Sequence, residues 1–454
     1  MMKNDVIIIG AGAAGLSAGV HLISLGYKVS IIERRNIPGG RAYSMKDPVT
    51  GEMVDNGQHL LAGAYRYFPK LLIALGTDKY LNYQKALHVP FIQSGRINRL
   101  DTGRLPGKAG LALGLLLFGA LSFKSKYNIL KLFLRIKAQK LNGVGLSAEE
   151  LLRTENQTAE SIEKFWNPII ISALNQDAQK ADSGLFVTVM EKAFFAGPED
   201  SRLIFPTADF NELFAPAAAW FADRGSELHT DKQVKELIIE GNRIKAVRIN
   251  KETIEAGCVI SAVPPGNLLK ILPEMYSGTT FFAPIANFGF SPIISAYYWF
   301  DSEVFGGEFA ALLDSRLHWA FNRRRICRYN KTISGNYPYC LSFTISDAGG
   351  LADLSIEKLK DLMLKDILGV FPQAAAAKLL HSKIIIEKNA TPSLAPGTEH
   401  MRLPHVTPIG NLFLAGDWTA TGLPATLESA AQSGFAAAEK AALLLKGRNT
   451  NRNE

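Results

Sequence analysis

The chain has 454 residues, of which 47% are hydrophobic and 20% are charged, and its formal net charge is +8. This composition supplies apolar material for roughly two or three domain cores and excludes a largely disordered or fibrous protein. The three cysteines, Cys258, Cys327 and Cys340, are scattered along the chain, which excludes a disulfide framework and zinc-site spacing and fits a reducing compartment.

The first predicted elements form a complete nucleotide-binding unit. Residues 5–9 are a short apolar run typical of a buried strand, residues 14–25 favour a helix, and residues 28–32 predict a second strand. The turn between strand and helix reads G-x-G-x-x-G, and it consists of Gly10, Ala11, Gly12, Ala13, Ala14 and Gly15. In this context the pattern is the fingerprint of a dinucleotide-binding Rossmann fold.

Each part of this unit has a physical role. Gly10 permits the tight turn, Gly12 lets the backbone approach a pyrophosphate, and Gly15 lets helix and strand pack closely. The N–H groups at the start of the helix bind phosphates. Glu33, which ends the second strand and precedes Arg34, is expected to accept hydrogen bonds from both ribose hydroxyls. Because its charge repels a 2′-phosphate, NADP is not expected in this site, whereas FAD and NAD both fit the motif.

Two short motifs follow the second strand. Gly39, Gly40 and Arg41 can bring backbone and a guanidinium group to a phosphate. The block at residues 54–59 ends in Gly57, Gln58 and His59, and we expect it to lie near the cofactor.

The basic excess of the chain is concentrated in residues 102–148, which contain no Asp or Glu. The eight cations there are Arg104, Lys108, Lys124, Lys126, Lys131, Arg135, Lys137 and Lys140. Residues 109–123 are uncharged but too short to span a bilayer, and residues 124–141 read as a basic amphipathic helix. The helix has one apolar face, formed by Tyr127, Leu130, Leu134 and Leu141. This arrangement predicts shallow insertion into an anionic membrane surface, and the alternative is a buried hairpin with a solvated basic side. A nucleic-acid partner is not expected, because the region lacks aromatics suited to base stacking.

The second half of the chain predicts a substrate domain with strands at residues 293–300 and 340–345. Aromatic residues that could line an apolar cavity are Phe281, Phe282, Phe288, Phe290, Tyr297, Tyr298, Trp299, Trp319 and Phe321.

Near the end of the chain, an apolar strand at residues 411–415 runs into Gly416 and Asp417. A carboxylate at this position can bind the hydroxyl groups of a ribityl chain. The helix that follows, opened by Thr426 and Leu427, can stabilise negative charge on a flavin ring through its N-terminus. Residues 448–454 are polar, and we expect a disordered tail there.

These motifs resemble the flavin-containing superfamily of amine oxidases, protoporphyrinogen oxidases and phytoene desaturases. The blocks at residues 55–61, 165–168, 173–175 and 416–428 are similar to the squalene-associated flavoproteins of bacterial hopanoid synthesis, the hydroxysqualene dehydroxylases. The resemblance implies an α/β fold, in which a Rossmann-type FAD-binding domain of the glutathione-reductase-like type carries an inserted α+β substrate domain. It assigns residues 1–80, 205–265 and 405–447 to the FAD-binding domain, with Val234 against the adenine. Residues 81–204 and 266–404 then form the substrate and membrane-facing domain.

The resemblance also implies a reaction, in which reduced FAD delivers hydride to hydroxysqualene and the hydroxyl leaves as water. An acid should protonate that hydroxyl, and His59 is the first candidate, followed by Asp55 and Glu428. The external reductant would be NAD(P)H or another protein, and no metal site is expected. A carotenoid-type desaturase and a non-catalytic, flavin-stabilised lipid carrier are the alternatives. The expected setting is the cytoplasm, on the inner face of the cell membrane, with neighbouring squalene-pathway enzymes as partners.

Overall fold

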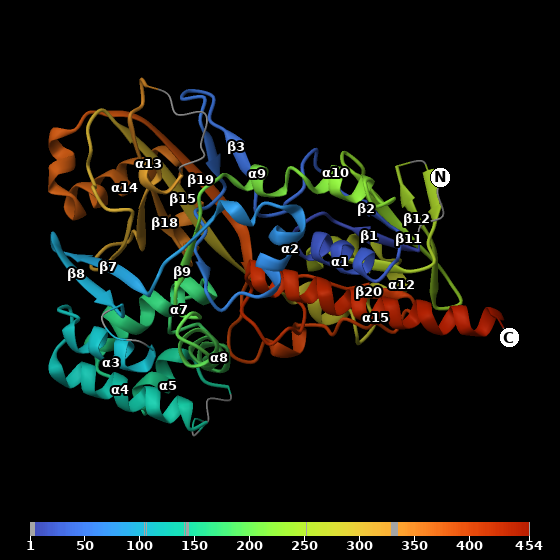
Figure 1. Ribbon diagram of the computed structural model, residues 1–454, viewed down its shortest axis with the longest axis horizontal. Helices are drawn as coiled ribbons and strands as arrows, with labels where there is room; N and C mark the ends of the chain where they lie inside the picture. Colours follow the sequence, from blue (N-terminus) through green and yellow to red (C-terminus); the bar gives the residue numbers. More distant parts are fainter. Residues whose placement is uncertain are drawn as a thin grey trace.

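A computed structural model describes residues 5–453 except 104, 106, 140, 142–144, 251 and 328–334, and it does not describe the side chains of 107, 108 and 448–453. Its two lobes are joined along one long axis (Figure 1). The lobe on the right of that view contains a parallel sheet covered by helices, and the lobe on the left contains a large antiparallel sheet. This architecture confirms the predicted α/β fold class.

A five-stranded parallel sheet forms the centre of the first lobe. Its strands, in spatial order, are β10 (Glu227–His229), β2 (Val29–Ile32), β1 (Val6–Ile9), β14 (Val259–Ser261) and β20 (Leu412–Leu414). β1, β2, β14 and β20 are buried throughout, as expected for a parallel sheet covered on both faces. The pairing of β14 with β20 brings the C-terminal part of the chain to within one strand of β1.

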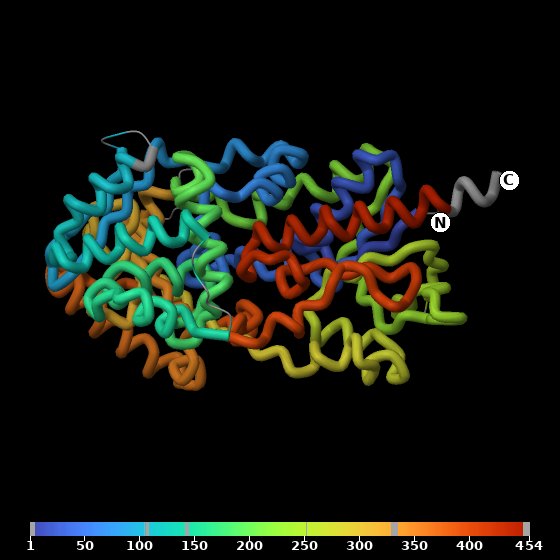
Figure 2. The backbone as a smooth tube through the Cα atoms, turned by 90° about the horizontal axis from the view of Figure 1, so that it is seen from below, coloured from blue at the N-terminus to red at the C-terminus, as the bar shows by residue number. Residues whose placement is uncertain are grey.

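Different elements cover the two faces of this sheet. On one face, α1 (Ala13–Ser24) packs against α15 (Leu427–Asn453) and α2 (Tyr67–Leu75), and Figure 2 shows the red α15 running beside the blue N-terminal elements. On the other face lies an antiparallel meander of β11 (Val234–Glu240), β12 (Arg243–Ile249) and β13 (Glu252–Glu255). Alternation of side chains along β1 serves both cores, because Val6 and Ile8 face the helices while Ile7 and Ile9 face the meander.

The second lobe is built on a seven-stranded sheet that is antiparallel except between β16 and β7. Its strands, in spatial order, are β19 (Leu379–Pro392), β15 (Phe290–Phe300), β18 (Tyr339–Ile345), β17 (Trp319–Asn322), β16 (Phe309–Leu312), β7 (His88–Gln93) and β8 (Arg96–Asp101). One face of this sheet packs against α14 (Ile356–Val370) through Leu359, Met363 and Ile367.

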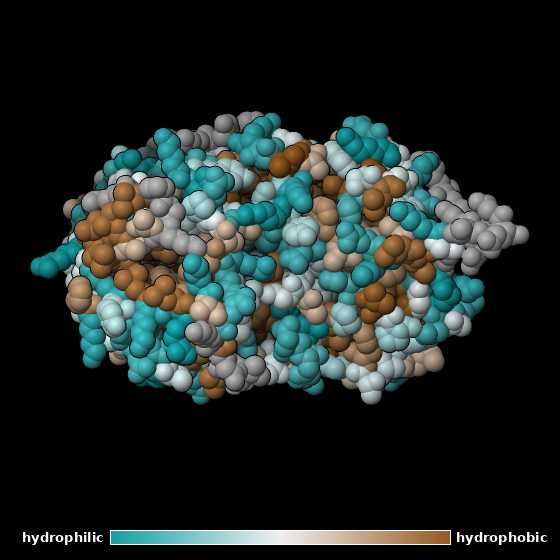
Figure 3. Space-filling view, turned by 60° about the horizontal axis from the view of Figure 1, so that its bottom comes forward, coloured by the Kyte–Doolittle hydropathy of each residue, from teal (hydrophilic) through white to brown (hydrophobic). Residues whose placement is uncertain are grey.

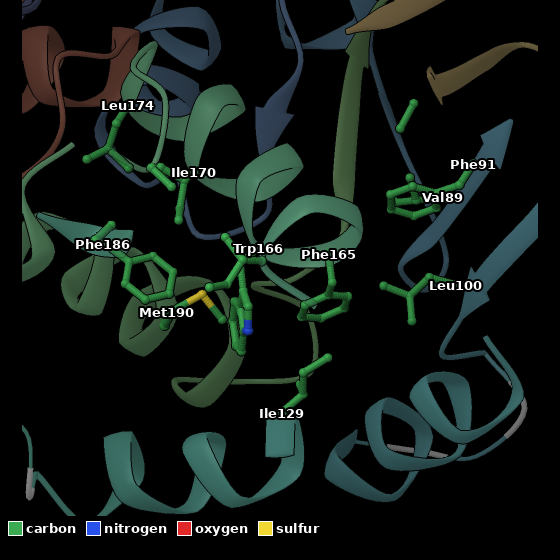
Figure 4. Packing of buried hydrophobic residues seen from close by; sticks show 14 of the residues in the cluster. Val89, Phe91, Leu100, Ile129, Phe165, Trp166, Ile170, Leu174, Phe186 and Met190 are labelled. Carbon is green, nitrogen blue, oxygen red and sulfur yellow. The ribbon is translucent and has the colours of Figure 1, made fainter. Parts of the chain in front are cut away.

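A helical layer forms the lower left of Figure 1. It contains α3 (Gly107–Leu117), α4 (Phe123–Lys137), α5 (Ala148–Thr154), α7 (Asn167–Leu174) and α8 (Ser183–Met190). Figure 4 shows how these helices share one core, in which Trp166 lies among Phe165, Phe186 and Met190 and above Ile129 of α4. The indole N–H of Trp166 donates to Gln157 at 2.9 Å, so the largest side chain of this core keeps a hydrogen-bond partner.

Short elements connect these layers. The remaining strands are β3 (Ser44–Lys46), β4 (Met53–Asp55), β5 (Leu61–Ala62), β6 (Leu81–Tyr83) and β9 (Leu203–Pro206). The remaining α-helices are α6 (Ala159–Ser161), α9 (Phe210–Phe214), α10 (Ala217–Ala222), α11 (Pro265–Ile271), α12 (Glu274–Ser277) and α13 (Arg323–Ile326). Two π-helical turns occupy Ile162–Trp166 and Glu191–Phe195. Turns of 3₁₀-helix occupy Asp78–Tyr80, Ala283–Asn287, Gly349–Asp353, Pro372–Ala376 and Glu399–Met401.

The backbone of α15 continues to Asn453, so it is helical in most of the segment 448–454 where a disordered tail is expected. A long helix can extend past its packed part, because each added residue costs little once the helix is nucleated. Among the residues that the structure describes, no helix is both long and apolar enough to cross a membrane.

Candidate functional site

A single cavity of about 410 Å³ lies where the two lobes meet. Both ends of the chain and the central segments contribute to its walls. The residues predicted to bind the cofactor that line it are Gly10, Gly12, Ala13, Ala14, Glu33, Arg34, Gly39, Gly40, Arg41, Gly57, Gln58, His59, Val234, Gly416, Asp417, Thr426 and Leu427. Sequence positions more than 400 residues apart therefore meet at one site, as the motifs predict.

One end of the cavity is built around the glycine turn. Gly10 has φ +101°, a left-handed conformation that glycine adopts without strain. Gly15 does not line the cavity and packs against the turn, where a Cβ atom at Gly15 would lie 1.9 Å from the carbonyl oxygen of Gly10. Gly15 thus allows α1 to pack on the turn, which is the role that its place in the motif predicts. No side chain caps the start of α1, so its N–H groups are available to a phosphate.

Glu33 lies at the end of β2 and is 5% exposed. Its two carboxylate oxygens accept hydrogen bonds from the backbone N–H groups of Ala11 and Arg35, both at 2.8 Å. These contacts hold the carboxylate against the phosphate turn. Each oxygen keeps a second lone pair that can accept a ribose hydroxyl.

The paired glycines and Arg41 lie across the turn from α1. A Cβ atom added to Gly40 would lie 3.0 Å from the Cα atom of Gly12, so the two loops enclose a cradle with little room for side chains. The guanidinium of Arg41 forms an ion pair with Asp417 and also donates to the carbonyl of Ala390 at 3.0 Å. The Arg41–Asp417 ion pair links the N-terminal and C-terminal motifs directly.

The C-terminal wall depends on Gly416, which has φ +140° and follows β20. A Cβ atom at Gly416 would lie 2.6 Å from the indole nitrogen of Trp418, which donates to the carbonyl of Val263 at 3.0 Å. The backbone N–H of Gly416 donates to the hydroxyl of Ser433 on α15 at 2.7 Å. These contacts fix Asp417 beside the start of α15.

The opposite end of the cavity is lined from the antiparallel sheet. Trp319 and Phe321 on β17 stack with ring centroids 6.3 Å apart, and the indole N–H of Trp319 donates to Ser172 at 2.9 Å. Ile293, Thr344 and Ser346 complete this wall. Of the nine aromatic residues proposed from the sequence, only Trp319 and Phe321 line the cavity. The others pack elsewhere, and Tyr297, Tyr298 and Trp299 are fully buried because both faces of β15 are covered.

His59 also lines the cavity. Its Nδ1 atom lies 2.7 Å from the carbonyl oxygen of Gly57, and its ring packs edge-on against Phe210. Burial lowers the pKa of His59, an effect that the nearby Asp55 carboxylate opposes in part. Because a carbonyl only accepts hydrogen bonds, Nδ1 carries the proton of the neutral ring and Nε2 is an acceptor. The structure therefore favours a hydrogen-bond acceptor at His59 over the acid proposed from the sequence.

The other two acid candidates do not reach the cavity. Asp55 is 3% exposed and accepts hydrogen bonds from Ser44 at 2.5 Å and from the fully buried Arg323 at 3.3 Å. Glu428 is 6% exposed and accepts the backbone N–H groups that begin α2, among them that of Arg66 at 2.7 Å and that of Phe68 at 2.9 Å. Each carboxylate is engaged in holding the fold together, so the acid role predicted for Asp55 and Glu428 stays a prediction that their positions do not favour.

Several cavity residues are missing from the predicted site. They are mainly Asn56, Tyr65, Ser172, Asn175, Lys232, Lys270, Thr344, Ser346 and Trp418. Burial raises the pKa of Tyr65 to about 12, which keeps its phenol protonated. Asn56 and Trp418 lie inside the blocks at residues 54–59 and 416–428, next to residues predicted to bind the cofactor, so the sequence contains a signal for them. Thr344 and Ser346 have no local signal, because only the register of β17 and β18 brings them to the cavity wall.

His318, which precedes Trp319 on the cavity wall, should make stability depend on pH. Burial lowers its pKa to about 4, although Asp177 and Asp347 act in the opposite direction. Between pH 6.5 and about 4 the unfolded chain binds the proton that the folded chain excludes, so stability should fall as the pH falls. In His318→Asn, whose amide oxygen can still accept the N–H of Ser346, we expect a weaker loss of stability over this range. Urea unfolding of wild type and His318→Asn at pH 7 and pH 4.5 measures how much stability each protein loses. Equal losses would contradict the assignment of this pH dependence to His318.

The chain is similar to known proteins over almost its whole length. A family model described as flavin containing amine oxidoreductase matches residues 13–442. A hydroxysqualene dehydroxylase from Sinorhizobium fredii is 28% identical, with 97% of this chain and 99% of that protein covered. A zeta-carotene desaturase from Synechocystis is 24% identical, with 96% of each chain covered. The crystal structure of an oxidoreductase from Methanosarcina mazei superposes with a TM-score of 0.74 at 15% identity, covering 96% of this chain and 99% of that one.

Proposed function

Because the chain belongs to the family of flavin-containing amine oxidoreductases and is therefore a flavin-dependent oxidoreductase, we propose that it uses reduced FAD to convert hydroxysqualene to squalene. The observation that carries this proposal is the form of the cavity. A cradle for phosphates at one end is continuous with a wall of stacked aromatic side chains at the other. The near full-length similarity to a hydroxysqualene dehydroxylase supports the same substrate.

The residues present fit FAD. The uncapped start of α1 and the side-chain-free space between Gly12 and Gly40 suit a pyrophosphate, and Glu33 suits the adenosine ribose. Val234 would lie against the adenine, and Asp417 would bind the ribityl hydroxyls. The start of α15 at Leu427 would place a positive helix end near the flavin ring.

The reaction replaces a carbon–oxygen bond by a carbon–hydrogen bond. Bound reduced flavin supplies the hydride, and an external two-electron reductant, a nicotinamide or a redox protein, must restore it. The chain itself has to hold the allylic carbon in place, exclude bulk water and stabilise the departing oxygen. Trp319 and Phe321 provide an apolar wall for the first two tasks. His59, as a neutral acceptor, does not suit the third.

An anaerobic assay tests this function. Purified protein reduced with dithionite in the presence of FAD is mixed with hydroxysqualene, and squalene is measured by gas chromatography. We expect squalene to form together with reoxidation of the flavin, seen as recovery of its absorbance. Absence of squalene together with conversion of phytoene by the oxidised protein would favour the desaturase alternative. The similarity to a zeta-carotene desaturase supports that alternative.

We also propose that α3 and α4 attach the protein to an anionic membrane surface. α4 has two apolar faces, and the buried one consists of Ile129, Leu132, Phe133 and Ile136. The other face carries Phe123, Tyr127 and Leu134, which are 77%, 61% and 69% exposed, and the end of α3 adds the exposed Leu116 and Leu117. Figure 3 shows a hydrophobic patch at this end of the molecule.

Basic side chains share the helix with this patch. Lys124, Lys131 and Lys137 are exposed on α4, whereas Arg135 is paired with Glu155 at 2.7 Å. Arg104, Lys108 and Lys140 lie outside the side chains that the structure describes. Exposed apolar residues within a basic surface complement the acyl chains and anionic headgroups of a bilayer. The buried-hairpin alternative accounts for one face of α4 and leaves the other unexplained.

Liposome flotation tests this surface. The triple substitution of Leu117, Phe123 and Leu134 by Ser should reduce binding to phosphatidylglycerol vesicles by at least about tenfold, because three large apolar side chains lose their contact with lipid. The matched control replaces Ile73, Met275 and Leu443 by Ser, residues of the other lobe that are 61%, 76% and 63% exposed. Equal flotation of the first variant and wild type would contradict the proposal. Leu115 and Phe118 are unsuitable for such a test, because both are fully buried.

A further inference from the structure

A buried network connects the cavity to the β3–β4 hairpin. Arg323, only 1% exposed, lies with Nη1 3.3 Å from Oδ2 of Asp55 and 3.3 Å from Oε1 of Gln58, and its Nη2 donates to the carbonyl of Met53 at 3.0 Å. Gln58 is the member of this network that lines the cavity. The position of Gln58 therefore depends on a charge that solvent does not reach.

The chemistry of Arg323 fixes the orientation of the Gln58 carboxamide. A guanidinium only donates hydrogen bonds, so the amide must turn its oxygen toward Arg323 and its nitrogen away from it. Within the part of the chain that the structure describes, Nε2 of Gln58 has no hydrogen-bond partner. This nitrogen is not sealed inside the protein. The amide N–H groups of Gln58 therefore face the open space of the cavity.

The adjacent residue offers the complementary group. Nδ1 of His59 is held by the carbonyl of Gly57, which leaves Nε2 as an acceptor. Gln58 and His59 thus present a donor and an acceptor at neighbouring positions. Both residues line the cavity, and Gln58 adjoins the aromatic wall, because its partner Arg323 directly follows β17 with the cavity residues Trp319 and Phe321.

We propose that Gln58 donates a hydrogen bond to the substrate hydroxyl oxygen as the carbon–oxygen bond breaks, with Arg323 as the positioning residue. This inference rests on the proposed function. As hydride adds to carbon, the electron pair of the carbon–oxygen bond leaves with the oxygen, and a proton from solvent completes the water. Gln58 transfers no proton, and its N–H stabilises the negative charge that develops on the oxygen.

Two substitutions separate this role from a structural one. Gln58→Met removes both the donor and the acceptor. Gln58→Glu keeps an oxygen for Arg323 and removes the donor unless the introduced carboxyl is protonated. Gln93→Met, on the surface and outside the cavity lining, is the control. Binding is followed by tryptophan fluorescence, because Trp319 lies in the cavity wall, with hydroxysqualene and with squalene as paired ligands.

We expect wild type and Gln93→Met to prefer the alcohol over the hydrocarbon. Gln58→Met should reduce this preference roughly twofold to tenfold, the effect of one neutral hydrogen bond. It should lower kcat by roughly tenfold to a hundredfold, because the bond strengthens as charge develops, with a smaller change in KM. For Gln58→Glu, the ratio of its rate to that of wild type should rise as the pH falls.

A Gln58→Met variant with wild-type preference and wild-type kcat would overturn the role of Gln58. A Gln58→Glu rate ratio that does not change with pH would do the same. Failure of the proposed function gives a different result, since wild type itself would then form no squalene and bind the two lipids equally. The role of Gln58 would fall with it.

Discussion

Replacing Arg323 by Met is expected to destabilise the protein by about 3–5 kcal/mol. The substitution leaves the carboxylate of Asp55, which is 3% exposed, without its cationic partner. The hydroxyl of Ser44 at 2.5 Å and the backbone N–H of Phe210 at 3.4 Å remain as donors to Oδ1, but neutral hydrogen bonds do not replace a buried counter-charge. Urea unfolding at pH 7 measures the change.

A double variant distinguishes the loss of the charge from the loss of packing. Asp55→Asn combined with Arg323→Met removes both charges, and we expect it to recover most of the lost stability. The matched surface control is Arg316→Met, which breaks an ion pair to Asp366 at 3.0 Å where the Arg316 side chain is 48% exposed. That control should cost less than about 1 kcal/mol. If Arg323→Met lowers the free energy of unfolding by no more than Arg316→Met does, the buried Asp55–Arg323 pair is not needed for stability.

Gly15→Ala is expected to abolish flavin binding and to cost about 3 kcal/mol or more in stability, at the upper end of overpacking effects. The added methyl group would lie 1.9 Å from the carbonyl oxygen of Gly10 and 3.3 Å from Ile8. Backbone atoms cannot rotate away, so α1 has to move off the turn that forms the phosphate cradle. Flavin absorbance after purification and the urea midpoint report the two effects separately.

The control for this substitution is Gly266→Ala. Gly266 also lies in a helix, α11, but a Cβ atom there meets nothing within 4 Å. Because alanine has the higher helix propensity, this variant should be as stable as wild type or slightly more stable. A Gly15→Ala protein that is yellow and as stable as Gly266→Ala would show that α1 does not need to approach the turn closely.

The glycine turn, the end of β2 and the strand before Gly416 could be predicted from the sequence because each signal is local. Gly10, Gly12 and Gly15 lie within six residues, and their spacing carries the information, although Gly10 and Gly12 approach the more distant Ala262 and Gly40. The parallel strands are continuous apolar runs because both sheet faces are covered. These local motifs together predict that both chain ends line one cavity, as the structure shows.

The roles of carboxylates and cations depend on distant partners that no local pattern identifies. Residues 323–325 are three consecutive arginines, which as a sequence read like a solvated surface run. In the structure Arg323 is buried against Asp55, Arg324 pairs with the buried Glu52, and Arg325 pairs with Glu303 at the surface. Glu428 likewise caps a helix that begins some 360 residues earlier in the chain.

The sequence of the basic helix α4 does not show which of its faces is buried. Its sequence contains two apolar stripes, and periodicity reveals that both exist without showing which one packs against the protein. The sequence predicts an apolar face of Tyr127, Leu130, Leu134 and Leu141. The core instead receives Ile129, Leu132 and Phe133, with Leu130 and Leu141 packed partly against it. The elements packed against α4, which are α3, α6 and the π-helical turn Glu191–Phe195, decide between the two stripes.

The central claim is that both ends of the chain enclose one FAD between Glu33 and Asp417, and the most direct test is the flavin content of the purified protein. Absorbance spectra before and after denaturation, with chromatography of the released cofactor, give its identity and amount. We expect a yellow protein that releases FAD in a stoichiometric amount, and that loses it in Gly15→Ala. A folded protein that is colourless and does not bind added FAD would contradict the account.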